Sequence, residues 1–172
     1  CFSQPAATTA DTLIVCVARP DLWRENCKLM LKTFDESGVS VPKTARDYYA
    51  KLLPLVYTFG PLNILSPLKW IMNNSIGLFR PMVRSPLTSF GFETVVAKSC
   101  ALACENLMLA FRAYGYDTCP MEGYDSVRLA KAIDLPGGAE FVMVIGAGRR
   151  DVGGIYGPRL RFDRRRFVKK IN

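Results

Sequence analysis

The sequence predicts an α+β fold, in which strands form one layer and helices pack against it. Three features lead to this prediction. A short run of apolar and β-branched residues lies toward each end of the chain, helical patterns lie between these runs, and one of the helices is apolar around most of its surface. With 172 residues, of which 49% are hydrophobic and 22% charged, the chain has the composition of one globular domain rather than of a disordered segment.

One strand and two helices are predicted in the N-terminal part. Residues 10–18 (ADTLIVCVA) form a continuous apolar run, which is typical of a buried strand. Residues 22–37 carry apolar side chains at helical spacing, and Gly38 is expected to end that helix. Residues 44–56 carry a second helical pattern.

Residues 58–90 are expected to be rich in loops, because glycine and proline interrupt short apolar pieces. The interrupting residues are Gly60, Pro61, Pro67, Gly77, Pro81 and Pro86. We interpret this segment as an arm that covers a partner or as a lid over a pocket. A surface excursion that packs on its own small core is the alternative.

A long helix is predicted over residues 94–114, and Gly115 is expected to close it. Because its apolar residues leave little room for a polar face, this helix is expected to lie in the core. A strand and turn follow over residues 117–124, ending in the tight turn Pro120-Met121-Glu122-Gly123. Glycine permits close approach to the backbone, so this turn can present N–H groups to a flat ligand.

A short helix and a second strand complete the predicted elements. The helix covers residues 126–133, with Asp125 as its N-cap. The strand covers residues 139–147 (AEFVMVIGA) and is apolar on both faces, as expected at the centre of a sheet. Glycines from Gly146 onward are expected to open a loop that leads to a basic tail.

Hydrolytic chemistry finds little support in the sequence. Histidine is absent, which excludes His-dependent serine or cysteine triads and removes the usual zinc partners. Glu122 and Asp125 share a turn but are interpreted as structural, so we assign no catalytic side chain and no metal site. The glycines at 148–154 lack the Lys-Ser/Thr of a phosphate-binding loop. Cofactor chemistry remains, in which the protein supplies position and electrostatics.

The cysteines indicate a reducing environment. None of the six forms a C-x-x-C pair, and Cys100 and Cys104 are interpreted as small core residues rather than metal ligands. A cytoplasmic location is therefore expected. No membrane partner is expected either, since Pro67 and Lys69 are among the residues that interrupt the apolar stretch 62–79.

The net charge of +8 comes mainly from residues 149–170. A terminal basic run is typical of binding to nucleic acid or to a phosphate-bearing ligand, and a solvated tail is the alternative. Aromatic residues are few in this segment, so nucleic acid is not expected as a partner.

The sequence resembles the FMN-dependent nitroreductase family. The resemblance is carried by the apolar helix and by Pro120-Met121-Glu122-Gly123-Tyr124-Asp125, which matches the family's Pro-x-Glu-Gly-Phe/Tyr-Asp loop beside the flavin. It implies one nitroreductase-like domain over residues 1–172, with a central, mainly antiparallel sheet flanked by helices around the long apolar core helix. It also implies a homodimer, in which 58–90 would be a lid or dimer-arm insertion.

The resemblance further implies a cofactor and its site. Pro120, Met121, Glu122 and Gly123 would lie along the ring of FMN, with the chemistry at flavin N5. Arg159 or Arg161, between which the sequence does not choose, would bind the phosphate. The implied reaction is a ping-pong reduction of a nitroaromatic, quinone or similar small molecule by NAD(P)H.

Two other functions are kept open. The first is a non-catalytic flavin-binding or interaction module of the same fold, and the second is a basic nucleic-acid-binding domain that uses residues 149–170. The first is favoured by a gap in the resemblance, since the family's N-terminal Arg-x-Ser-x-Arg and Gln-Pro-Trp segments are not found in this sequence. The domain is therefore expected to be N-terminally incomplete and to match the C-terminal two thirds of a family member.

Overall fold

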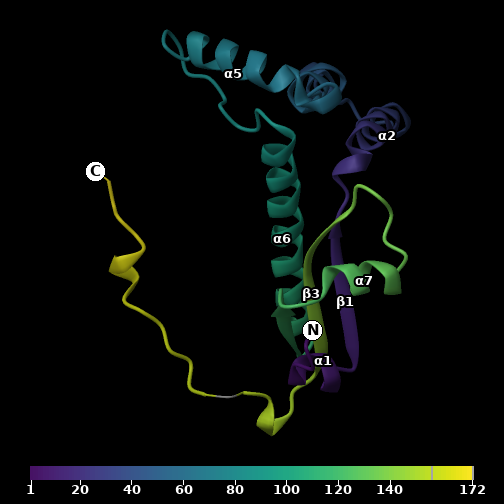
Figure 1. Cartoon of the computed structure of the whole chain (residues 1–172), viewed down its shortest axis with the longest axis vertical. Helices are drawn as coiled ribbons and strands as arrows, with labels where there is room; N and C mark the ends of the chain where they lie inside the picture. The colour runs from purple at the N-terminus through teal and green to yellow at the C-terminus, as the bar shows by residue number, and fades with distance from the viewer. Residues whose placement is uncertain (156, 172) are drawn as a thin grey trace.

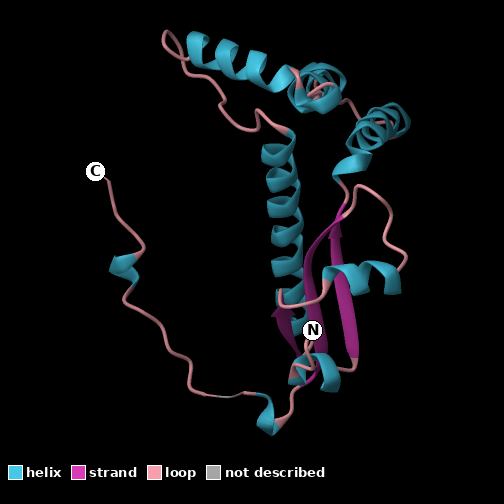
Figure 2. Ribbon diagram, viewed as in Figure 1, coloured by secondary structure: helices cyan, strands magenta, loops and turns pink. Residues whose placement is uncertain are grey.

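The centre of the protein is a three-stranded antiparallel sheet (Figures 1 and 2). The computed structural model describes residues 1–155 and 157–171. Strands β1 (Thr12–Ala18), β2 (Tyr116–Met121) and β3 (Glu140–Arg149) lie in the order β1-β3-β2. Both predicted strands and the strand before the turn are confirmed, and the fold is α+β as predicted.

Strand β3 is central, as its apolar sequence predicts. Ile145 and Val144 are the most deeply buried large side chains, with exposed fractions of 0% and 2%. The strand continues to Arg149, so the expectation that Gly146 opens a loop is wrong. Gly146 instead provides room for helix α1 (Pro5–Thr9), because a Cβ atom there would lie 2.9 Å from the Ala6 carbonyl oxygen.

Helix α6 (Ser89–Ala113) contacts all three strands and runs along one face of the sheet (Figure 1). It begins five residues before the predicted start, because the Thr88 hydroxyl caps it by accepting a hydrogen bond from the Gly91 N–H at 3.0 Å. Gly115 follows its end with a φ of 86°, the left-handed conformation expected of a closing glycine.

Much of α6 is uncovered in the single chain. Cys104 and Phe92 are buried, whereas Phe90, Leu102 and Leu109 are exposed by 76%, 70% and 58%. The helix therefore lies against the core without being enclosed by it, which differs from the prediction. By length and composition alone α6 could cross a membrane, a test that core helices of soluble proteins also pass.

The helices of residues 23–76 form a second group above the sheet in Figure 1. They are α2 (Trp23–Glu36), α3 (Lys43–Asp47), a π-helical turn (Tyr48–Leu52), α4 (Leu53–Tyr57) and α5 (Leu65–Ile76). An aromatic cluster of Trp23, Tyr57, Phe59 and Phe92 joins α2 and α4 to α6, with the rings of Tyr57 and Phe92 4.3 Å apart.

Segment 58–90 contains a helix of 12 residues, α5, where loops were expected. Pro67 does not prevent the helix because it is the third residue of α5, and the N–H groups of a first turn need no partner within the helix. Single-turn 3₁₀ helices cover Pro20–Leu22, Pro61–Asn63, Val152–Gly154 and Arg164–Arg166. Helix α7 (Ser126–Ala132) lies between β2 and β3 in the chain.

Candidate functional site

The turn Pro120-Met121-Glu122-Gly123, here called the PMEG turn, begins inside β2 and leaves the sheet at its edge. Pro120 and Met121 are the last residues of β2 and pair with Ile145 and Val144 of the central strand. Met121 is only 3% exposed, so its side chain anchors the turn in the core. Proline is tolerated here because β2 is an edge strand.

The chain beyond the PMEG turn is held on both sides. The Tyr124 N–H donates to the Glu122 carbonyl at 3.1 Å, and the Tyr124 ring meets the Phe141 ring edge-on at 5.6 Å. The Asp125 carboxylate accepts from the Arg128 N–H at 3.0 Å, which confirms its predicted role as the N-cap of α7. These contacts hold the residues that directly follow the turn.

The outer surface of the PMEG turn is open. Glu122 and Gly123 are exposed, and neither N–H has an acceptor within residues 1–155 and 157–171. The Gln4 side-chain amide donates to the Gly123 carbonyl at 3.5 Å. Its nitrogen is also the one described atom beyond the adjacent residues that lies within 4 Å of a Cβ built at Gly123. A flat molecule can approach this backbone closely.

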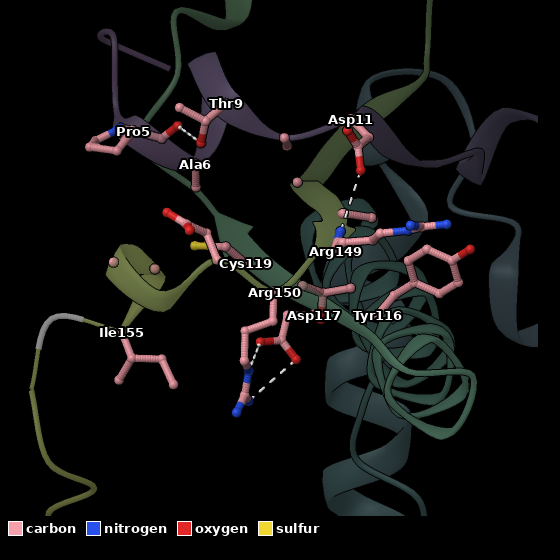
Figure 3. A pocket seen from close by; sticks show the side chains of 18 of the residues that line it. Pro5, Ala6, Thr9, Asp11, Tyr116, Asp117, Cys119, Arg149, Arg150 and Ile155 are labelled. Atoms are coloured by element: carbon pink, nitrogen blue, oxygen red, sulfur yellow. Dashed lines mark hydrogen bonds and ion pairs between the residues drawn. The ribbon is translucent and has the colours of Figure 1, made fainter.

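A hollow lies elsewhere, beside the start of β2 (Figure 3). It encloses about 820 Å³ between α1, β2, the end of β3 and the 3₁₀ turn that follows. It includes none of the PMEG residues. In the single chain, therefore, the predicted site is a surface turn rather than a pocket.

Charged side chains in this hollow pair with each other. Arg150 Nε donates to Asp117 Oδ2 at 2.5 Å, and Arg112 Nη1 donates to Asp117 Oδ1 at 2.8 Å (Figure 3 draws the Arg150 pair). The hydrogen bond from Arg150 is the main reason that the pKa of Asp117 is lowered. Asp11 accepts a hydrogen bond from the Arg149 N–H at 3.3 Å. These pairs link β2 to α6 and to the residue after β3, and they link the end of β3 to the residue before β1.

Arg159 and Arg161, the predicted phosphate ligands, lie in the C-terminal tail. Figure 1 shows this tail leading away from the sheet and helices, and both side chains are exposed. Arg161 Nη1 donates to the Leu160 carbonyl at 2.7 Å. The single chain therefore does not bring these arginines to the PMEG turn, and their role stays a prediction.

Three thiols meet between β1 and α6. The pKa of Cys16 is raised to about 12, first by burial and then by a hydrogen bond with Cys104, with Cys100 nearby. The pKa of Cys100 is raised in the same direction, again first by burial. The thiols of Cys16 and Cys100 therefore stay protonated. Cys104 is 3% exposed and packs as a small core residue. Among residues 1–155 and 157–171, no three His, Cys, Asp or Glu side chains are arranged to hold a metal ion.

Comparison with known proteins gives consistent results. Residues 85–149 match the model of the nitroreductase family. Protein DrgA of Synechocystis is 40% identical over 53 residues, which are 31% of this chain and 25% of DrgA. A nitroreductase-like protein of Streptococcus mutans superposes with a TM-score of 0.64 at 18% identity, over 98% of this chain and 67% of that structure. The resemblance to the nitroreductase family is confirmed.

Two further structures agree on the fold. The nitroreductase family protein of Streptococcus pneumoniae has a TM-score of 0.63 at 15% identity, over 95% of this chain and 66% of that structure. A protein of Exiguobacterium sibiricum, solved in complex with FMN, has a TM-score of 0.61 at 20% identity, over 93% of this chain and 63% of its own. The nitroreductase-like chain described here thus spans about two thirds of the length of these structures.

The PMEG turn is apparent from the sequence, but its contact with Gln4 is not. Gln4 and Gly123 are separated by 119 residues, and no local pattern marks such a pair. The Asp117 ion pairs and the carbonyl contacts of the Lys69 ammonium are likewise not apparent from it. A charged side chain within an apolar helix, as at Lys69, is the one signal that could have indicated a specific partner.

Proposed function

We propose that this nitroreductase-like chain is part of an FMN-dependent NAD(P)H oxidoreductase. The match to the nitroreductase family supports an oxidoreductase, and the FMN complex of the E. sibiricum protein supports the choice of cofactor. When bound, FMN would accept a hydride from NAD(P)H at N5 and later pass two electrons to a nitroaromatic, quinone or similar acceptor.

The observation that supports this proposal best is the open surface of the PMEG turn. Its exposed N–H groups at Glu122 and Gly123 have no acceptor among the described residues, and glycine leaves the backbone accessible. Donors fixed in advance stabilise the charge that develops on a ring nitrogen during hydride transfer. The exposed N–H groups of the turn are therefore suited to bind the isoalloxazine ring of a flavin. Its role is to bind and orient the ring, since it contains no nucleophile.

The site would be completed by a second copy of the chain. Phe90, Leu102 and Leu109 of α6 are exposed in the single chain, and exposed apolar surface of this kind is typical of an interface. A homodimer would cover α6 and segment 58–90. It would also give the tail arginines of one copy a flavin phosphate to bind.

A steady-state assay tests the proposal. Chain incubated with FMN is mixed with NADH or NADPH, and oxidation is followed at 340 nm with a quinone or a nitroaromatic as acceptor. Turnover that requires both FMN and an acceptor supports the proposal. FMN binding without turnover favours the alternative, a non-catalytic flavin-binding or interaction module, which the separation of Arg159 and Arg161 from the turn also favours. Absence of both rejects the flavin function.

A further inference from the structure

Gln4 links the start of helix α1 to the PMEG turn through its side-chain amide. Its nitrogen Nε2 donates to the Gly123 carbonyl at 3.5 Å, although the two residues are 119 positions apart in the chain. A Cβ atom built at Gly123 would lie 3.1 Å from the same nitrogen. The amide of Gln4 therefore lies over the backbone of Gly123, in the direction that a side chain at this position would take.

This close approach gives a reason for glycine at position 123. Gly115 and Gly138 have positive φ angles, which favour glycine, but Gly123 does not. The atom that a side chain at 123 would meet belongs to the Gln4 amide. Glycine is therefore explained here by the space that Gln4 occupies, and not by the conformation of the backbone.

The contact holds one peptide group of the turn at both of its polar ends. This group joins Gly123 to Tyr124: its carbonyl accepts from Gln4, and its N–H donates to the Glu122 carbonyl at 3.1 Å. The second bond spans two residues, which is the pattern of a γ-turn centred on Gly123. Because the Glu122 carbonyl is turned toward Tyr124, the Gly123 N–H in the same planar trans peptide group points the opposite way.

The main chain at Gln4 is itself held in place. Its carbonyl accepts hydrogen bonds from the N–H groups of Ala7 and Thr8 at 2.8 and 3.2 Å. Phe2 and Ser3, which form the turn before it, have φ angles of 49° and 54°. Left-handed conformations are strained for such residues and persist where the surrounding structure determines them. The Gln4 side chain therefore extends from a fixed main chain.

Helix α1 places Gln4 relative to the sheet. A Cβ atom at Gly146 would lie 2.9 Å from the Ala6 carbonyl oxygen, so α1 lies directly on the central strand β3. Gly146 pairs with Cys119 of β2, the strand that leads into the PMEG turn. The same part of the sheet thus positions both Gln4 and the turn.

We propose that Gln4 is a positioning residue of the flavin site, whose amide holds the Gly123 carbonyl and so keeps the Gly123 N–H directed at the ring. The proposal rests on the proposed function, because it concerns the turn that would bind the isoalloxazine ring. Gln4 would act through the backbone of Gly123, without contact with the reacting atoms.

Gln4→Met tests the contact without flavin. Methionine is close to glutamine in length, but it has no N–H donor. In two-dimensional nitrogen–proton NMR spectra the Tyr124 cross-peak is expected to move, and its N–H is expected to exchange about fivefold faster, as for the loss of one hydrogen bond. Thr9→Val is the matched control, since it removes the 2.8 Å hydrogen bond to the Pro5 carbonyl within α1. It should leave Tyr124 unchanged, and an unchanged Tyr124 in Gln4→Met would overturn the proposal.

Gly123→Ala tests the same contact from the other side and leaves Gln4 in the chain. Its Cβ would lie 3.1 Å from the Gln4 amide, which must then move. Gln4 is the single glutamine of the sequence, so its side-chain NH₂ resonances are identified by their loss in Gln4→Met. If Gln4→Met does not fold, an assigned spectrum of the wild type identifies them. Gly123→Ala is expected to shift these resonances, and unchanged resonances would overturn the contact.

A double-mutant cycle measures the coupling of the two residues. The free energies of unfolding of Gln4→Met, Gly123→Ala and the double variant are expected to be non-additive, because each single variant disrupts the same contact. Additive effects would overturn the contact.

A flavin measurement separates this proposal from the proposed function. Reduction of bound FMN by NADH or NADPH in a single turnover is expected to be about fivefold slower in Gln4→Met than in the wild type, because the Gly123 N–H is no longer held in advance. If Gln4 only stabilised the fold, this rate would not change at saturating FMN, and that result would overturn the positioning role. A wild type that binds no FMN rejects the proposed function and the flavin role of Gln4, whereas the NMR spectra decide the contact with Gly123 independently.

Discussion

Replacing Gly146 by alanine should destabilise the protein, although alanine is normally the better residue in a strand. The added Cβ would lie 2.9 Å from the Ala6 carbonyl oxygen and 3.3 Å from Ala10 Cβ. The first distance is shorter than real Cβ contacts, and the opposing atom is backbone, so α1 must move. Relief by movement of a flexible side chain is not possible there.

The expected magnitude follows from two opposing effects. Forcing an extra methyl group into a packed site costs about 1–3 kcal/mol. Replacing a glycine within a strand recovers about 0.5–1 kcal/mol of chain entropy. The net destabilisation then lies within about 0–2.5 kcal/mol and is centred near 1 kcal/mol, which lowers the Tm by roughly 2–4 °C for a chain of this length. α1 has no buried residue, so it can leave the sheet at a small cost. The free energy of undocking α1 is therefore the upper limit of the destabilisation by Gly146→Ala.

Thermal unfolding and hydrogen exchange measure this effect. Exchange should accelerate in α1, where the N–H groups of Ala7 and Thr8 donate to the Gln4 carbonyl. Gly137→Ala is the control, because a Cβ there meets no atom within 4 Å, and its stability should change by less than about 0.5 kcal/mol. A Gly146→Ala protein as stable as the wild type, with α1 equally protected, would refute the reasoning.

Three further predictions concern the core, the thiols and pH. Ile145→Ala should lower the free energy of unfolding by about 2–5 kcal/mol in a denaturant titration, because this side chain is fully buried; a loss below 1 kcal/mol would contradict the burial. A maleimide at neutral pH should label exposed Cys119 first and Cys16 only on unfolding, since burial raises the pKa of Cys16 to about 12. The reverse order of labelling in peptide mass spectra would be inconsistent with the packing of Cys16 between β1 and α6. Asp117→Asn should lower the free energy of unfolding at neutral pH, because it removes the ion pair with Arg150, which lowers the pKa of Asp117. The difference in stability between variant and wild type should shrink as pH falls below 3.8, since protonation of Asp117 removes the same ion pair. A stability difference independent of pH and salt would argue against this ion pair.

The helices and strands that depend on residues adjacent in the chain could be predicted from the sequence. Residues 12–18 and 140–149 form strands because β-branched and apolar residues are continuous there, and Asp125 caps α7 because an Asx side chain reaches the third N–H beyond it. The PMEG turn was found for the same reason, since its proline and glycine lie within four consecutive residues of the chain.

Contacts between distant segments could not be predicted in this way. The Gln4 side chain donates to the Gly123 carbonyl, 119 residues away in the chain. Helix α1 packs against Gly146, which lies within strand β3. Helix α5 was missed because Pro67 suggested a break, although its position in the first turn is compatible with a helix. The exposed face of α6 also differs from the prediction, because an apolar surface does not indicate whether its own chain or another one covers it.

The most direct test of the account is a titration of FMN with the purified chain, followed by flavin fluorescence. The account predicts saturable binding of one FMN per chain. It also predicts that Gly123→Val weakens binding about tenfold or more, because side-chain bulk separates the ring from the backbone N–H groups, while Gly137→Ala leaves affinity unchanged. Equal affinity of the wild type and Gly123→Val, or no binding by the wild type, would contradict the PMEG turn as a flavin site.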